Sequence, residues 1–188
     1  MNETVTDSAP DPAPDSAPDS ASDNDSSREA RAALFRAHAT ARFRLDTAEA
    51  ARLAATLRPE HRMGHLLFQV CLFAQVVFDE YGTAPDPGDL AELTETLHRK
   101  HYPKDRNFTA IKAEAMIRAV CDESLLLTEI PQAEQPGYMW AVMNELVRPD
   151  ATDADLAERF EVAEEVGPDL LKQAFEQTIA APVKEASA

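Results

Sequence analysis

The stretch from Pro59 to Tyr81 constrains the fold most, because its apolar residues occur on every side of the helix that their spacing predicts. Leu66 and Phe73 would share one face, and Phe68 would lie on the opposite one. A helix that is apolar all round must be covered on all sides, which places it in the middle of a core. The sequence therefore predicts a mainly α, compact multi-helix domain around a buried central helix.

Other helices are predicted where a capping residue precedes apolar positions that recur three or four residues apart. The predicted segments are residues 27–41, 46–58, 89–101 and 109–122. Residues 125–142 are less distinct, since their pattern fits helical spacing better but Tyr138, Trp140 and Val142 also alternate as on one face of a strand. A small β-hairpin is therefore kept as the alternative for this segment.

The chain divides into three parts by composition. Residues 1–27 hold seven acids and no base and repeat a short unit of Asp, Ser, Ala and Pro, so we expect a disordered acidic tail. Residues 28–149 are predicted to form the helical core domain. Residues 150–188 are predicted to be an acidic helical hairpin, divided at Gly167-Pro168 and packed on the core.

The charges are sorted along the chain, which has a formal net charge of −16. Such a chain cannot bind a polyanion with its whole surface, so any contact of that kind needs a local basic patch. Residues 28–62 hold eight arginines against four acids. These arginines share no stripe on the first predicted helix, so we expect them to attract the acidic C-terminal hairpin or the tail.

The cysteines and the apolar runs indicate an ordinary intracellular protein. Cys71 and Cys121 both lie in apolar helical patterns, where burial would raise the thiol pKa and leave them inert. The N-terminus lacks the pattern of a secretory signal, and the most apolar run, residues 66–78, is shorter than the roughly 20 residues that cross a bilayer. The expected location is therefore cytoplasmic, without membrane contact.

Residues 89–138 can be divided in the order helix, turn, helix, strand, loop and strand, which resembles a winged helix-turn-helix. The resemblance implies that residues 109–122 would enter a DNA major groove and that the loop after Ile130 would be the wing. That wing would hold Glu129 and Glu134 and no base, whereas a wing on DNA needs cations for the phosphates. Winged helices also serve as protein-docking modules, which gives a second use for the same order of elements.

A local basic patch falls in this segment, because six bases and only two acids occur between residues 99 and 118. A phosphate backbone or an acidic protein surface would recognise such a patch. The candidate partner-binding or DNA-binding residues are Arg99, Lys100, Lys104, Arg106, Lys112 and Arg118. The predicted function is a non-enzymatic adaptor or regulator that docks a protein partner here, and the alternative is a winged-helix DNA-binding transcriptional regulator.

Two histidine pairs at helical spacing give a second alternative, a helical-bundle metal-binding protein. One pair is His61 with His65, and the other is His98 with His101. Glu95 and His98 also match the ExxH element of carboxylate-bridged di-iron bundles, but such sites need a second ExxH, which the chain lacks. Solvated histidines at helix ends are the simpler interpretation, so no metal or other cofactor is expected.

Enzyme signatures are missing from the chain, which has no GxGxxG, GxxxxGK[ST], GxSxG or HExxH motif. No catalytic residue is therefore assigned. An exposed apolar face on the last predicted helix, with Leu170, Leu171 and Phe175, would favour a homodimer.

Overall fold

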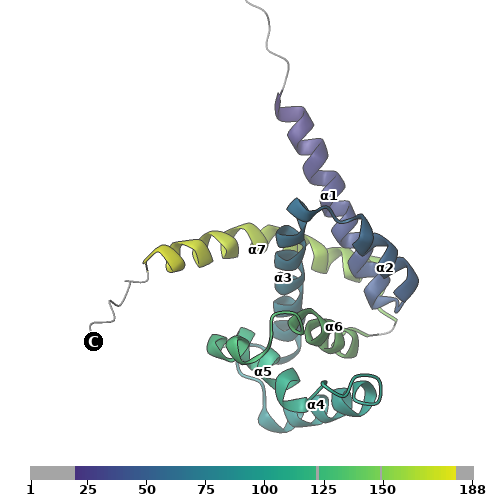
Figure 1. Cartoon of the computed structure of the whole chain (residues 1–188), viewed down its shortest axis with the longest axis vertical. Helices are drawn as coiled ribbons and strands as arrows, with labels where there is room; N and C mark the ends of the chain where they lie inside the picture. The colour runs from purple at the N-terminus through teal and green to yellow at the C-terminus, as the bar shows by residue number, and fades with distance from the viewer. Residues whose placement is uncertain (1–19, 122, 149, 181–188) are drawn as a thin grey trace, which may run out of the picture.

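The computed structural model describes residues 20–121, 123–148 and 150–180, and the regular elements within them are all helices (Figure 1). This confirms the prediction of a mainly α protein. The α-helices are α1 (Ser20–Phe43), α2 (Thr47–Thr56), α3 (Arg62–Tyr81), α4 (Pro87–His101), α5 (Ala110–Cys121), α6 (Gln135–Leu146) and α7 (Asp153–Ala180). Two short 3-10 helices, η1 (Pro59–His61) and η2 (Ser124–Glu129), precede α3 and α6.

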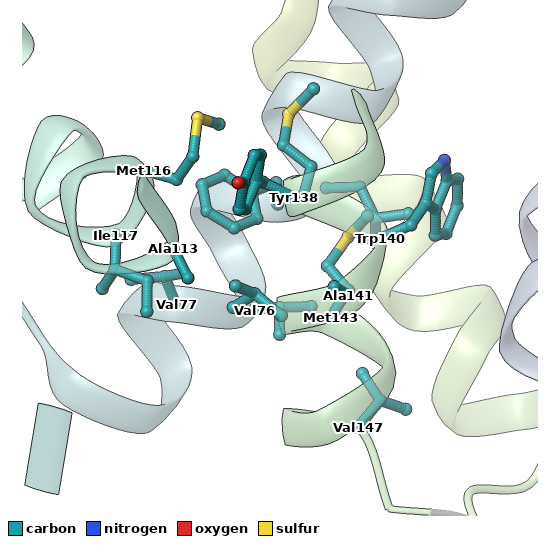
Figure 2. Close-up of a cluster of buried hydrophobic side chains, with 14 of the residues drawn as sticks. Val76, Val77, Ala113, Met116, Ile117, Tyr138, Trp140, Ala141, Met143 and Val147 are labelled. Atoms are coloured by element: carbon teal, nitrogen blue, oxygen red, sulfur yellow. The ribbon is translucent and has the colours of Figure 1, made fainter. Parts of the chain in front are cut away.

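Helix α3 is the centre of the core, as its all-round apolar pattern predicts. Phe73 and Val77 are fully buried, and α3 packs against α5, α6 and α7. The helix ends at Gly82, whose φ of 64° is a backbone conformation that glycine adopts at little cost. Figure 2 shows how Val76 and Val77 of α3 meet Met116 and Ile117 of α5 and Met143 of α6 in one apolar cluster.

The segment 125–142 holds two helical stretches joined by a turn at residues 130–134 and no strand, so neither the β-hairpin alternative nor the strands of a wing are confirmed. Residues 124–129 form η2, and Pro136 lies in the first turn of α6, where a missing backbone N–H costs nothing. From Tyr138 to Met143 every side chain of α6 is buried. The alternation that suggested a strand therefore has another cause, since α6 is covered on all sides over these six residues.

Both ends of the described chain differ from the predicted boundaries. The predicted tail covered residues 1–27, but α1 already begins at Ser20, and residues 1–19 lie outside the described part. The predicted hairpin break at Gly167-Pro168 is not found, because α7 is one continuous backbone helix. Gly167 and Pro168 are both poor formers of a helix interior, so local propensity predicted a break that the backbone of α7 does not show.

Helices α1 and α2 lie side by side as an antiparallel pair (Figure 1). The side chain of Asp46 caps α2 by accepting a hydrogen bond from the Glu49 N–H at 3.0 Å, as the capping pattern predicts. Ala41, Ala50 and Leu53 form a small buried cluster between these two helices, separate from the main core. None of the described helices is long and apolar enough to cross a membrane.

Candidate functional site

The basic segment is built around the turn that joins α4 to α5, residues 102–109. Helix α4 begins at Asp86, whose carboxylate accepts the Gly88 N–H at 2.7 Å. At its other end Tyr102, Lys104 and Asp105 donate their N–H groups to carbonyls of the last turn of α4. The backbone of the turn is therefore tied to the end of α4 before any side chain contributes.

Tyr138 of α6 fixes the far side of this turn. Its hydroxyl accepts the Thr109 N–H at 3.0 Å and donates to the Asn107 carbonyl at 3.1 Å. The Tyr138 ring stacks on Phe108, with 4.5 Å between ring centroids, and both residues are buried. One side chain thus satisfies two backbone groups of the turn that would otherwise lose their hydrogen bonds on burial.

The two histidines at the end of α4 also hold the turn. His101 stacks on Phe108 with 4.8 Å between centroids, and burial lowers the pKa of its imidazole, with Lys104 lowering it further. His98 Nδ1 lies 3.2 Å from the Phe108 carbonyl, so in its Nδ1–H tautomer it donates to that oxygen. The turn is therefore a rigid platform made of stacked rings and backbone hydrogen bonds.

Three of the six candidate basic residues are neutralised within the protein. Lys100 Nζ lies 2.7 Å from Glu145, and Lys112 Nζ lies 2.6 Å from Glu134. Arg118 bridges two further acids on and beside its own helix, Glu114 at 3.1 Å and Glu123 at 2.8 Å. The hydrogen bonds to these carboxylates raise the pKa values of Lys112 and Arg118. Their charge is thus largely used inside the protein.

The other three candidate residues, Arg99, Lys104 and Arg106, are exposed and have no ion-pair partner in the described part of the chain. The guanidinium of Arg106 lies over the Tyr102 ring, 4.6 Å from its centroid. Arg99 donates to the Thr96 hydroxyl at 3.1 Å. Two of the three cations are therefore positioned by neighbouring side chains before any partner arrives.

Helix α5 exposes one narrow side and buries the other. Ile111 is 78% exposed, and the side chains of Glu114 and Arg118 on the same side are partly exposed. Ala113, Met116 and Ile117 pack into the core. A helix that enters a major groove needs unpaired cations beside the phosphates, whereas Arg118 on this side is paired with Glu114 and Glu123.

The predicted histidine pairs are not brought together as metal sites. His65 turns toward α1, where its Nε2 lies 3.1 Å from His38 Nδ1, rather than toward His61. His98 and His101 serve the α4–α5 turn, and Glu95 is an exposed residue of α4. Among the described residues no three His, Cys, Asp or Glu side chains lie close enough to hold one ion.

A pocket of about 380 Å³ lies between the loop after α3 and the end of α5. It is lined by Thr83, Ala84, Pro85, Pro87, Leu90, Glu114, Arg118, Cys121 and Glu123. Arg118 is already held by Glu114 and Glu123, and burial raises the pKa of the Cys121 thiol. Burial also raises the pKa of the Cys71 thiol, so both cysteines are poor nucleophiles.

One arginine of α1 and one just after it pair with the acidic C-terminal helix, in line with the attraction expected between these segments. Arg36 makes a two-pronged ion pair with Glu164 at 2.7 and 2.5 Å. Arg44 donates to Asp153 at 2.9 Å. These contacts join α1 to α7 in antiparallel order. The predicted dimer face uses Leu170, Leu171 and Phe175, whose side chains fall outside the described part, so the homodimer stays a prediction.

Comparison with known proteins adds no relative. No protein family, no curated protein and no solved structure matches the chain.

Proposed function

We propose that this protein is a non-enzymatic intracellular adaptor that docks a protein partner through the α4–α5 turn. The observation that supports this most is the position of Arg99, Lys104 and Arg106 on a turn that Tyr138 and Phe108 hold rigid. A rigid surface loses little conformational entropy on binding, so more of the contact energy becomes affinity. The docking surface is defined as Arg99, Tyr102, Lys104, Arg106 and Ile111.

The composition of the docking surface favours a protein over a nucleic acid. It combines three cations with two exposed apolar side chains, Tyr102 at 37% and Ile111 at 78% exposure. Aromatic residues and arginine are enriched at protein interfaces, while a phosphate backbone offers nothing to an exposed isoleucine. The ion pairs of Lys100, Lys112 and Arg118 with carboxylates of the protein also leave fewer cations for the DNA-binding alternative.

Charge reversal on the turn tests this proposal. Full-length wild-type protein and the double variant Lys104→Glu/Arg106→Glu would be used to capture proteins from a lysate of the source cells. The control is Arg58→Glu/Arg62→Glu, which reverses two exposed arginines near η1. We expect at least one protein whose capture falls by roughly tenfold or more with the turn variant and is retained by the control. If every captured protein binds all three baits equally, the turn is not the docking surface.

A further inference from the structure

Helix α1 docks on the rest of the protein through one narrow face. Phe35 and Phe43 lie two turns apart on this face. The ring centroids of Phe35 and Phe68 are 5.9 Å apart, and those of Phe43 and Trp140 are 5.6 Å apart. Phe160 of α7 completes the surface beneath α1 at 6.5 Å from Phe43. Because α2 packs on α1 through its own small cluster, the two helices form one unit, residues 26–56, called here the α1–α2 module.

A pair of histidines lies at the centre of this interface. His38 of α1 is 7% exposed, and its Nδ1 lies 3.1 Å from Nε2 of His65 on α3. Their rings meet edge to face at 4.8 Å, and His38 also meets the Trp140 ring at 5.9 Å. A hydrogen bond between two ring nitrogens needs one N–H donor and one free lone pair, so a doubly protonated pair loses its bond.

The charged groups around the pair also disfavour extra protons. Arg42, one turn after His38 on α1, lies over the Trp140 ring at 5.1 Å. On α3 the facing group is His65 itself, and α6 presents the uncharged Trp140. The acids Glu164 and Asp153 of α7 are already paired with Arg36 and Arg44. No described carboxylate contacts either ring to compensate a charge there.

Burial lowers the pKa of His38 to about 4, with His65 and Arg42 lowering it further, and burial also lowers the pKa of His65. A group whose pKa is depressed in the docked state favours that state in its neutral form. Docking is therefore fully favoured above the ordinary histidine pKa of about 6.5 and is weakened as the pH falls from there toward 4.

We propose that the α1–α2 module is an acid-released cover over the aromatic surface of Phe68, Trp140 and Phe160, with the His38–His65 pair as its release group. In the docked form the neutral pair joins α1 to α3. Protonation of both rings places two positive charges at one buried contact. The α1–α2 module then separates from α3 to α7, which stay folded. The released state exposes an apolar surface that is covered at neutral pH.

Trp140 is the only tryptophan of the chain and lies in this interface, so its fluorescence reports the release directly. The full-length protein would be titrated from pH 8 to 4 while the emission maximum and the far-ultraviolet circular dichroism are recorded. We expect a red shift of the emission with a midpoint between about 4 and 6.5, while most of the helical signal is retained. Loss of both signals in one step would mean global unfolding and would overturn the proposal.

Histidine variants identify the release group. In His38→Phe and His65→Phe the midpoint should move down by about one pH unit or more, since phenylalanine keeps an aromatic ring and cannot be protonated. His61→Phe, four residues before His65 and outside the pair, should behave as wild type. An unchanged midpoint in both pair variants contradicts the assignment.

Hydrogen exchange on the wild-type protein tests the same release without any substitution. We expect peptides from residues 26–56 to lose protection at pH 5 relative to pH 7, after correction for intrinsic exchange, while α3 and α6 keep theirs. Equal protection of the α1–α2 module at both values would contradict release even if the variants failed to fold.

Discussion

Replacing Phe73 by aspartate is expected to leave the protein insoluble or without a cooperative melting transition. Phe73 is fully buried in the middle of α3, so a carboxylate there would have no water and no cation to compensate its charge. A cost of about 5 kcal/mol or more is comparable to the whole stability of a typical domain. Soluble expression and thermal melting followed by circular dichroism would measure the effect.

The control for this variant is the same substitution five residues further along the helix. Phe78 is 40% exposed, so Phe78→Asp leaves the new carboxylate in contact with water. It should lower the melting temperature only slightly and keep a cooperative transition. A wild-type-like melt of Phe73→Asp, or equal damage from both substitutions, would contradict the central position of α3.

Truncating Tyr138 to alanine is expected to cost about 3 kcal/mol or more in the free energy of unfolding, because it removes a buried ring that stacks on Phe108. It also removes the acceptor of the Thr109 N–H and the donor to the Asn107 carbonyl. Urea unfolding of both proteins measures the difference, and hydrogen exchange at Thr109 should increase most.

Two further variants separate the parts of this effect. Tyr138→Phe keeps the ring and loses only the hydroxyl, so it should cost about 1–3 kcal/mol, the usual effect of a buried group left without its partner. Tyr102→Phe changes an exposed ring on the same turn and should change stability by less than about 0.5 kcal/mol. If Tyr138→Phe were as stable as wild type, the hydroxyl would not hold the turn.

The parts of the fold that could be predicted from sequence are those with local causes. The all-round apolar pattern of α3 identified the core helix, and the predicted start of a helix at Asp46 agrees with its role as the cap of α2, because a capping carboxylate acts within three residues. The segment around Tyr138 could not be assigned in the same way. A helix buried on every side has no polar face, so its pattern also matches an alternating strand.

The geometry of the candidate site depends on contacts that no spacing reveals. Tyr138 reaches Thr109 across 29 residues of sequence, and His65 meets His38 across 27. Sequence spacing instead paired His65 with His61, four residues earlier, whereas the structure pairs His65 with His38. The six basic residues were recognisable as a patch, but which of them are neutralised by Glu134, Glu145 and Glu123 depends on how the helices pack.

Ile111 was missed as a surface residue for a related reason. An isoleucine near the start of an apolar helical pattern is normally assigned to the core, and only the packed structure shows it 78% exposed. Its exposure in the first turn of α5, directly after the basic turn, distinguishes a protein-docking surface from a purely basic one.

The most direct test of the central claim, that the basic turn serves a protein and not a nucleic acid, is a titration of the full-length protein with a mixed-sequence DNA duplex. We predict no measurable binding at about 50 mM salt, because the −16 net charge and the internal ion pairs leave too few free cations for the phosphates. Binding at about 50 mM salt that weakens by orders of magnitude at about 200 mM, and that is lost in Lys104→Glu/Arg106→Glu, would contradict the claim and favour the DNA-binding alternative.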